Sequence, residues 1–428
     1  MPELRKDCAT PHCKTNRFLT VFHGKAGQIA LSVLDPVLSS AAVFTIQGAV
    51  LLSASKIEFA AFSLSYSYII MGQAILSSLF GGPLITLLGK IPDDVERRLA
   101  GEGILRLQLL ASLLLGFTSL LISFLFHIDL IVSTLCIASF IGLSYRDALR
   151  SVLAAQNRLL EGLILSFVFA LIVACGLTTS YILFDRISLI SGLSILAISA
   201  VIICSTFVMQ GSINTRLPRG QILSDLSSMA VWSLPGTAVI WLQNSFYLTL
   251  VAINLNLTAV GEISAARMLI MPILIITSGM LRLFQVKARL RLNDGGLSEA
   301  LVTVRAPLFL CFATGLFIAI LCLIFDGSRI HNLMPIGHRN LLMLAGAWVL
   351  FATATTARGI YSALFQAMGC YREIFFYNAA LLPFVLAGIA VGPRVIGLVG
   401  AILPMVAGEL FLLALLVWRA KIYHAAAI

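Results

Sequence analysis

The sequence has 428 residues, of which 59% are hydrophobic and only 11% are charged, and its mean hydropathy is +1.00. Soluble domains carry about 25% charged residues, so this composition excludes an ordinary soluble protein and indicates a polytopic membrane protein. Cys8, His12 and Cys13 near the amino terminus supply too few donors for a four-ligand zinc site, so we expect no bound metal.

Twelve apolar runs follow one another along the chain, and most reach the roughly 20 residues needed to cross about 30 Å of hydrocarbon. Twelve membrane helices would place both termini on the same side. We therefore predict an all-α polytopic membrane protein with about twelve transmembrane helices. The runs are Gln28–Leu52, Phe59–Leu88, Ile104–Phe126, Leu130–Tyr145, Leu160–Phe184, Ile187–Gln210, Trp232–Leu255, Thr258–Gln285, Ala306–Phe325, Leu341–Ala357, Ile374–Val391 and Val395–Trp418.

The basic residues define the orientation, because Lys and Arg accumulate on the cytoplasmic side of membrane proteins. With the amino terminus inside, most of the 29 Lys and Arg residues fall on cytoplasmic segments. We therefore expect a multi-pass membrane protein with both termini in the cytoplasm. The net charge of +10 then reflects topology and contact with anionic membrane lipids, and it gives no reason to expect nucleic acid as a partner.

The loops leave little room for an enzyme. The predicted outer turns are short apart from Asp326–Asn340, and no outer domain can hold a catalytic centre. The sequence also lacks the G-x-x-x-x-G-K-[ST] loop that binds the phosphates of ATP. We therefore predict that the protein is not an enzyme and that it uses no cofactor.

Two pairs of short segments indicate an internal repeat. Ser55–Ala61 precedes the second apolar run, and Ala259–Ala265 stands in the same place before the eighth. In the connectors predicted on the inner side of the membrane, Ser151–Ala154 resembles Ser362–Phe365. We predict two six-helix lobes of the same orientation, related by an axis along the membrane normal. The predicted organisation is a cytoplasmic N-terminal segment (1–27), an N-lobe (28–210), a cytoplasmic inter-lobe linker (211–228), a C-lobe (229–418) and a cytoplasmic tail (419–428).

The seventh and eighth runs are unusually polar for segments in hydrocarbon. The seventh contains Pro235 and, about midway, the amide pair Gln243 and Asn244. The eighth places Arg267 roughly 13 Å along its axis, at about 1.5 Å per residue. Polar groups and helix-bending prolines are costly in lipid. We therefore expect this region to border a polar cavity through which a large amphiphilic molecule moves.

Four stretches carry a family resemblance: the turn before the second run (Lys56, Glu58, Phe59, Ala60, Phe62), its counterpart at the eighth (Gly261, Glu262, Ala265, Ala266) and the two connectors 150–158 and 358–369. Their layout resembles the polysaccharide-transporter branch of the multidrug/oligosaccharidyl-lipid/polysaccharide flippase superfamily, which includes the O-antigen repeat-unit flippases. The resemblance implies a V-shaped, two-lobed bundle in which helices one, two, seven and eight border a central cavity. It also implies an undecaprenyl-pyrophosphate-linked oligosaccharide as substrate, and polymerase and export proteins of a polysaccharide pathway as partners.

Arginine suits such a substrate, because its planar guanidinium donates paired, charge-assisted hydrogen bonds to phosphate oxygens. Arg267 is the first candidate anchor; the alternative is that it snorkels to the outer interface or pairs with Glu262. Arg146, Arg150 and Arg358, at inner helix ends, are further candidates for contact with the diphosphate. Their alternative role is to determine topology and contact anionic lipid.

Four amide side chains come from the runs expected to border the cavity, and they are candidates for binding sugar hydroxyls. The alternative is that they form ordinary interhelical amide hydrogen bonds. These residues are Gln47, Gln73, Gln243 and Asn244.

Two acids in apolar runs are candidates for ion coupling. Asp35, followed by Pro36, would titrate, exchange a proton or bind a cation during the transport cycle. Its alternative is an inner-interface acid exposed to water or paired with Lys25 or a neighbouring arginine. Glu409 lies in the middle of the twelfth run, where it would serve coupling or pairing within a lobe, or else form a plain structural hydrogen bond.

The mechanism that we predict is alternating access, in which the lobes rock about the linker and expose an arginine-lined cavity to one side and then the other. The first alternative is a cation-coupled small-molecule or drug antiporter of the same superfamily. A less favoured alternative is a membrane enzyme acting on lipid-linked sugars. The net charge of the side chains lining the cavity distinguishes the flippase from the drug antiporter. An excess of arginine favours an anionic lipid-linked sugar, while uncompensated acids favour a cationic drug.

Overall fold

The computed structural model describes residues 25–426 apart from residues 82–83, 85–87, 89–90, 92, 126–128, 157, 210–219, 326–337 and 369. Every regular element in this part of the chain is a helix, which confirms the all-α prediction. The elements are α2 (Lys25–Ser53), α3 (Lys56–Leu76), the π-helix η1 (Ser77–Gly81), α5 (Asp94–Leu125), α6 (Leu130–Ala155), α7 (Leu159–Phe184), α8 (Leu189–Met209), α9 (Gly220–Asn244), α10 (Tyr247–Asn254), α11 (Leu257–Met268), α12 (Met271–Phe325), α13 (His338–Ala367), α14 (Tyr371–Ile396) and α15 (Val399–Ala426).

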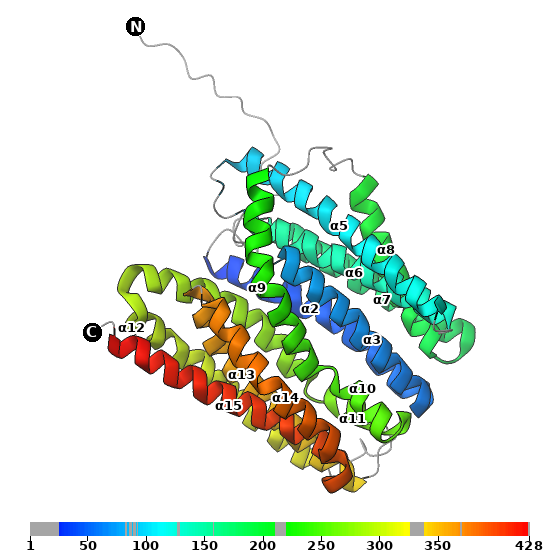
Figure 1. The fold of residues 1–428 in the computed structure, drawn as a ribbon. Helices are drawn as coiled ribbons and strands as arrows, with labels where there is room; N and C mark the ends of the chain where they lie inside the picture. The colour runs from blue at the N-terminus through cyan, green and yellow to red at the C-terminus, as the bar shows by residue number, and fades with distance from the viewer. Residues whose placement is uncertain are drawn as a thin grey trace.

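Most of these helices can cross a membrane. In the described part of the chain, nine helices are long and apolar enough to do so, α9 with α10 forms a tenth, bent span, and α8 is apolar over the shorter stretch Leu189–Ser205. Figure 1 shows α12 turning back on itself, and Gly296 near its middle has a φ of 71°. The first arm of α12 therefore continues the eighth predicted run, and the second arm is the ninth. The protein is a multi-pass membrane protein.

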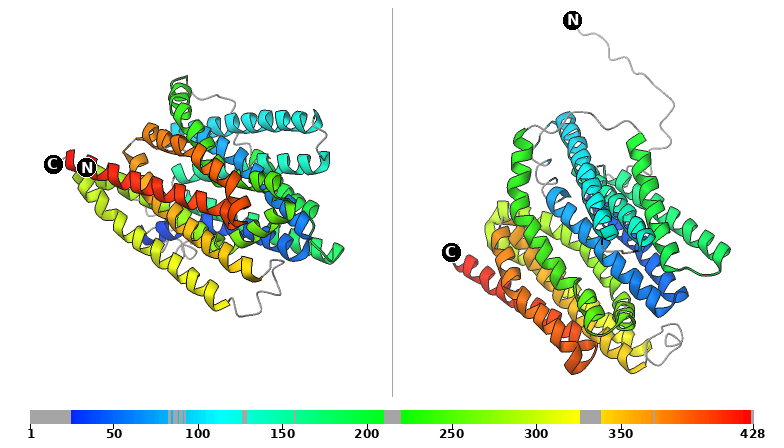
Figure 2. Two further views of the ribbon diagram at one scale, coloured as in Figure 1. Left: turned by 60° about the horizontal axis from the view of Figure 1, so that its bottom comes forward. Right: turned by 45° about the vertical axis from the view of Figure 1, so that its right-hand side comes forward.

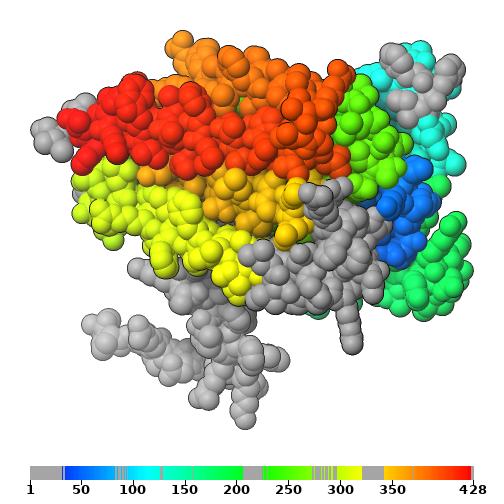
Figure 3. All heavy atoms as spheres, turned by 90° about the horizontal axis from the view of Figure 1, so that it is seen from below, coloured from blue at the N-terminus to red at the C-terminus, as the bar shows by residue number. Residues whose placement is uncertain are grey.

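The helices form two lobes that follow the two halves of the chain (Figures 1 and 2). In the N-lobe, α2, α3 and α5 to α8 surround an apolar core that includes Ile46, Leu143 and Phe169. In the C-lobe, α9 to α15 surround further cores, the largest of which includes Val260 and Trp348. Figure 3 shows α15 lying across one face of the C-lobe, between α14 and α12. This arrangement confirms the predicted two-lobed architecture.

Side-chain caps fix where three helices begin. Ser55 and Glu58 form a capping box at α3, in which the Glu58 amide donates to Ser55 Oγ (3.2 Å) and the Ser55 amide donates to Glu58 Oε2 (3.0 Å). Asp129 caps α6 by accepting from two amides, and Asn256 caps α11 by accepting from the Ala259 amide (2.8 Å). Because the first amides of a helix have no partner within it, each cap stabilises its helix at a defined first residue.

The two lobes meet where α3 and α11 pack together, and these helices carry the two copies of the predicted repeat. At Gly261 a β-carbon would lie 2.9 Å from the backbone oxygen of Lys56, so the missing side chain allows this close approach. Ala60 of α3 packs into the C-lobe core, while Ala265 and Met268 of α11 pack into the N-lobe core. We call this surface the α3–α11 contact; it joins the lobes at the helix ends that the predicted topology places outside.

Polar contacts from α9 and α10 extend the junction between the lobes. Trp241 Nε1 of α9 donates to the backbone oxygen of Ser67 in α3 (3.3 Å). The hydroxyl groups of Tyr68 in α3 and Thr249 in α10 lie 3.0 Å apart, within hydrogen-bond distance. In Figure 1, α9 accordingly runs along the boundary between the lobes and leads into α10 beside α11.

Both polar runs are interrupted. The seventh passes through Pro235 as one helix and breaks at Ser245 and Phe246, beside the amide pair, so that α9 and α10 differ in direction by 41°. The eighth breaks just after Arg267, and α12 begins with Pro272 in its first turn, where a missing backbone N–H is tolerated. Pro235 is therefore not the point at which the seventh run is interrupted.

Helices extend past two of the predicted boundaries. Residues 220–228 of the predicted linker form the first turns of α9, and residues 419–426 of the predicted tail belong to α15. Residues 211–219 of the linker lie outside the described residues. Residues 1–24 also lie outside them, and with them the segment containing Cys8, His12 and Cys13.

Candidate functional site

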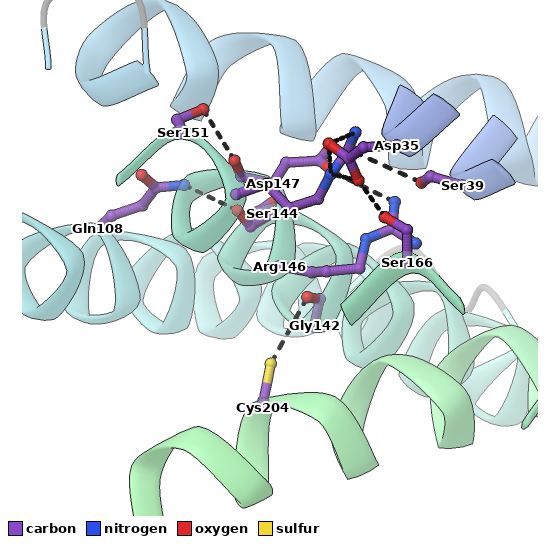
Figure 4. Close-up of polar contacts among 11 residues, drawn as sticks. Asp35, Ser39, Gln108, Gly142, Ser144, Arg146, Asp147, Ser151, Ser166 and Cys204 are labelled. Atoms are coloured by element: carbon purple, nitrogen blue, oxygen red, sulfur yellow. Dashed lines mark hydrogen bonds and ion pairs between the residues drawn. The ribbon is translucent and has the colours of Figure 1, made fainter. Parts of the chain in front are cut away.

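Four charged side chains gather inside the N-lobe (Figure 4). The carboxylate of Asp35 in α2 accepts from Arg150 Nε (2.9 and 3.0 Å) and from Arg150 Nη2 (2.8 Å). Asp147 Oδ1 accepts from Arg150 Nη1 (3.3 Å) and from Arg146 Nη2 (3.2 Å). We call these residues, Asp35, Arg146, Asp147 and Arg150, the N-lobe charge cluster. Two acids face two arginines in it, so its formal charges cancel.

The Asp35–Arg150 pair joins a predicted ion-coupling acid to a predicted substrate-binding arginine. Its side chains are only 17% and 9% exposed, respectively. Ser166 of α7 donates to Asp35 Oδ1, and Ser39 of α2 accepts from Arg150 Nη1 at 3.5 Å. Such a forked, charge-assisted contact is strong and geometrically specific. Asp35 therefore has the arrangement considered as its alternative, an acid paired with a neighbouring arginine, and an ion-coupling role stays a prediction.

The helical period of α6 brings the other members of the cluster together. Arg146 and Arg150 are four residues apart and so lie on one face of α6, with Asp147 three residues before Arg150. The guanidinium of Arg146 lies over the ring of Phe169 in α7, with Cζ 4.0 Å from the ring centroid. Figure 4 shows the Arg146 side chain extending towards Ser166, on the same side of α6 as Asp35.

The C-lobe holds a second buried ion pair. Arg358 Nε of α13 donates to Glu409 Oε2 of α15, and the two residues are 7% and 3% exposed. This pair again joins a predicted substrate-binding arginine to a predicted ion-coupling acid. It lies within one lobe and links two helices of its core, which is the lobe-internal pairing considered for Glu409.

Arg267 differs from the paired arginines, because aromatic rings surround it. Its Nη1 donates to the hydroxyl of Tyr247 (3.3 Å), and its Cζ lies 5.8 Å from the Tyr247 ring centroid and 5.4 Å from that of Trp348. Trp348 is held in place by donating Nε1 to the Ile263 carbonyl (3.1 Å). Within the described residues no carboxylate pairs with Arg267, Glu262 included, and its Nε is buried without a partner. No acid among the described residues therefore neutralises Arg267.

The four predicted amides divide into two groups. Gln243 is buried in the C-lobe, where its Nε2 donates to the Asn378 carbonyl of α14 (2.9 Å), so it forms the interhelical bond considered as its alternative. Asn244 ends α9, Gln47 is buried on α2 and Gln73 is half-buried on α3. In the described part of the chain, these three side chains make no hydrogen bond with protein groups. They remain candidates for contact with a sugar.

Several residues of the site carry no signal in the sequence. Tyr247 and Trp348 frame Arg267 from positions 20 residues and 81 residues away, and no spacing rule links such positions. Ser166 is one serine among many in apolar runs. Asp147 could have been found, because an acid beside Arg146 and one turn before Arg150 is suited to pair with both.

Comparison with known proteins finds similarity in the fold but none in the sequence. No family model matches the sequence, and no curated protein matches it. The two-lobed helical bundle is instead shared with solved membrane transporters of the MOP superfamily, so the chain has the fold of that class.

The particular structures belong largely to MATE transporters. Two of them are the outward-facing and inward-facing conformations of a multidrug resistance MATE family transporter of the MOP superfamily, and both give a TM-score of 0.68. The outward-facing structure is 13% identical in sequence and the match covers 96% of this chain and 98% of that chain. The inward-facing structure is 14% identical and the match covers 92% of this chain and 98% of that chain. A MOP superfamily transporter from Pyrococcus furiosus, for which reverse polarity of the binding pocket suggests a different function, gives 0.64 at 15% identity, covering 96% of this chain and 98% of that one. At these identities the likeness shows the fold alone.

Proposed function

We propose that the protein is a transporter that works by alternating access and moves an anionic amphiphile between the leaflets of a bacterial inner membrane. The substrate class that we infer is an oligosaccharide linked to a polyprenyl lipid through a diphosphate. One observation carries this choice: within the described residues, the buried acids Asp35 and Glu409 are paired with arginines, while no acid pairs with Arg267.

The charge balance argues against an organic cation as the substrate. Asp35 is bound by Arg150 and Glu409 by Arg358, so neither carboxylate presents a free negative charge. A cationic substrate would have to displace a guanidinium from a buried carboxylate, and breaking such a pair costs about 3–5 kcal/mol. An anionic substrate has no such barrier at Arg267.

The surroundings of Arg267 suit a phosphate group. The rings of Tyr247 and Trp348 hold the guanidinium by cation–π contacts, which contribute about 0.5–2 kcal/mol, and Nη1 donates to the Tyr247 hydroxyl. Its Nε has no partner among the described residues, and a guanidinium edge is the group that binds phosphate oxygens in pairs. The lipid tail of the substrate would remain in the bilayer throughout.

The second candidate is a cation-coupled drug antiporter. The fold comparisons favour it at least as well as they favour a transporter of a lipid-linked oligosaccharide. Among the similar structures are those of a multidrug resistance MATE family transporter. In this candidate, Asp35 or Glu409 would carry a proton or sodium ion and release its arginine during the cycle. It differs from the first in the charge of what is carried.

Proteoliposomes separate the two candidates. The assay follows a fluorescent undecaprenyl-diphosphate oligosaccharide between leaflets and, in parallel, efflux of a cationic dye under a pH gradient. We expect movement of the lipid-linked sugar, its loss in Arg267→Ala, and its retention in Arg394→Gln, a matched change at an exposed arginine at the end of α14. Dye efflux without movement of the lipid-linked sugar would overturn the proposal in favour of the antiporter.

A further inference from the structure

Arg146 is a deeply buried cation whose hydrogen bonding is incomplete. It is 4% exposed, and its Nε and Nη1 are buried without a partner among the described residues. Its Nη2 reaches only Asp147, a carboxylate that it shares with Arg150 and whose side chain is 43% exposed. Leaving a buried donor without a partner is costly, and more so when the donor is charged. Such a group in a folded protein calls for a further ligand.

The C-lobe shows what is missing around Arg146. The repeat that aligns Ser151–Ala154 with Ser362–Phe365 places Arg358 within one residue of the position equivalent to Arg146. Arg358 has an acid of its own, Glu409 from the last helix of the C-lobe. The last helix of the N-lobe, α8, contains no acidic residue; its Cys204 instead contacts the Gly142 carbonyl, one turn before Arg146 on α6. The negative charge that completes Arg358 therefore has no counterpart in α8.

Tyr66 lies on α3, the helix that packs against both α6, which carries Arg146, and α11, which carries Arg267. Its hydroxyl is within electrostatic range of both guanidinium groups, one in each lobe. The ring stacks on Phe62, with the two ring planes 2° apart and the centroids separated by 6.3 Å, so its direction is fixed. The Tyr66 side chain is half-buried, and its hydroxyl makes no hydrogen bond within the described part of the chain. A donor group is thus free on the helix that contacts the helices of both incompletely paired cations.

We propose that Arg146, Tyr66 and Arg267 form one bipartite anion site across the junction of the lobes, and that this site takes the two phosphates of a diphosphate headgroup. The inference rests on the proposed function and specifies where its substrate binds. Arg146 takes one phosphate through Nε and Nη1, Arg267 takes the other, and the Tyr66 hydroxyl donates between them. The substrate supplies the acceptors that Arg146 Nε and Nη1 lack within the described residues.

The arrangement also links binding to movement. Arg146 belongs to α6 of the N-lobe and Arg267 to α11 of the C-lobe, so an anion held by both contacts both moving bodies. A ligand shifts a conformational equilibrium only as far as its affinity differs between the states. A diphosphate that bridges the two arginines in one state, and reaches a single arginine in the other, provides that difference.

Inorganic pyrophosphate is the probe for this site. Its affinity for the purified full-length protein is measured from the rise in melting temperature with concentration, because a ligand of the native state stabilises it by mass action. We expect pyrophosphate to bind the wild-type protein, and Arg146→Gln to weaken binding by about tenfold, or about 1.4 kcal/mol. Tyr66→Phe is expected to weaken it by a smaller factor. Arg372→Gln, at an exposed arginine stacked on Trp232, is the matched control with unchanged affinity.

A second variant is needed in case the N-lobe does not fold with Arg146→Gln. Arg146→Lys keeps the charge but lacks the planar fork, so we expect intermediate affinity. Absence of pyrophosphate binding in the wild type, or equal affinity in the wild-type, Arg146→Gln and Tyr66→Phe proteins, would overturn the site. Loss of binding in Arg267→Gln alone would also overturn it, since that result assigns the anion to one arginine.

The liposome assay distinguishes failure of the site from failure of the proposed function. If Arg146→Gln and Tyr66→Phe move the lipid-linked sugar at the wild-type rate, the bipartite site is wrong while the proposed function stands. If the wild-type protein binds pyrophosphate through Arg146 but moves no lipid-linked sugar, the site stands and the proposed function is wrong.

Discussion

Replacing Glu409 with glutamine tests whether the Arg358–Glu409 pair is structural. The change keeps the size of the side chain and leaves the Arg358 guanidinium buried, at 7% exposure, without a counter-charge. Removing one member of a buried pair typically costs about 3–5 kcal/mol. We therefore expect the free energy of unfolding to fall by about that amount, measured by circular dichroism in mixed micelles of increasing denaturing detergent.

Two further variants make this prediction specific. Glu161→Gln is the matched control, because its partner Arg158 forms a pair in which both side chains are more than 40% exposed, and such pairs contribute about 0–1 kcal/mol. The double variant Arg358→Met with Glu409→Leu removes both charges, so we expect it to regain most of the lost stability.

A stabilising role for the buried Arg358–Glu409 pair is contradicted if Glu409→Gln loses no more stability than Glu161→Gln, or if the double variant is as unstable as Glu409→Gln. A stable double variant that transports at the wild-type rate assigns the pair to structure. A stable double variant without transport would instead support the ion-coupling role predicted for Glu409 from the sequence.

Three shorter predictions concern other contacts. Gly261→Ala places a β-carbon 2.9 Å from the Lys56 backbone oxygen, so we expect the free energy of unfolding to fall by about 1–3 kcal/mol. We also expect a shift towards the conformation in which the α3–α11 contact is open, measured by cysteine accessibility at that contact. The control Gly346→Ala, whose β-carbon meets nothing within 4 Å, should be neutral or slightly stabilising. Asp35→Asn leaves Arg150 with one half-exposed carboxylate, and we expect about 2–4 kcal/mol of destabilisation by the same detergent titration, with an unchanged melting curve contradicting the pairing. Tyr247→Phe removes the 3.3 Å hydrogen bond to Arg267 but keeps the ring, so transport should fall by no more than about tenfold, equivalent to about 1.4 kcal/mol, in the liposome assay; complete loss would show that the hydroxyl matters more than the ring.

Much of the fold could be predicted from the sequence, because membrane helices must be long, apolar and internally hydrogen-bonded. Helices stand at all twelve predicted apolar runs, and the repeat correctly indicated two lobes. The structure adds helix boundaries that the sequence does not indicate. Pro235 lies within a continuous α9, and the break comes instead at Ser245 and Phe246. The helical start at Gly220 is also invisible to a hydropathy pattern, because Gly220–Ser228 is mostly polar.

The site was predicted as a set of residues but not as a set of contacts. Asp35 and Arg150 are 115 positions apart, and Arg358 and Glu409 are 51 apart, so their pairing depends on how helices pack within each lobe. The sequence assigned the acids and the arginines to separate roles because it could not show them in contact. Arg267 was identified from its cost in hydrocarbon, and only the structure places aromatic rings around it.

The small size of the groups at the α3–α11 contact bears on how easily the lobes can separate. Where Gly261 crosses Lys56 and Ala60, the touching atoms are backbone and methyl groups, not large apolar side chains. Hydrophobic association scales with apolar area, at about 25 cal/mol per Å², so a crossing made of such groups adds little to the work of separation. The Gly261 crossing is therefore tight in its geometry but weak in its energy, and the work of separating the lobes lies instead in the apolar side chains that cross the contact elsewhere, such as Met268.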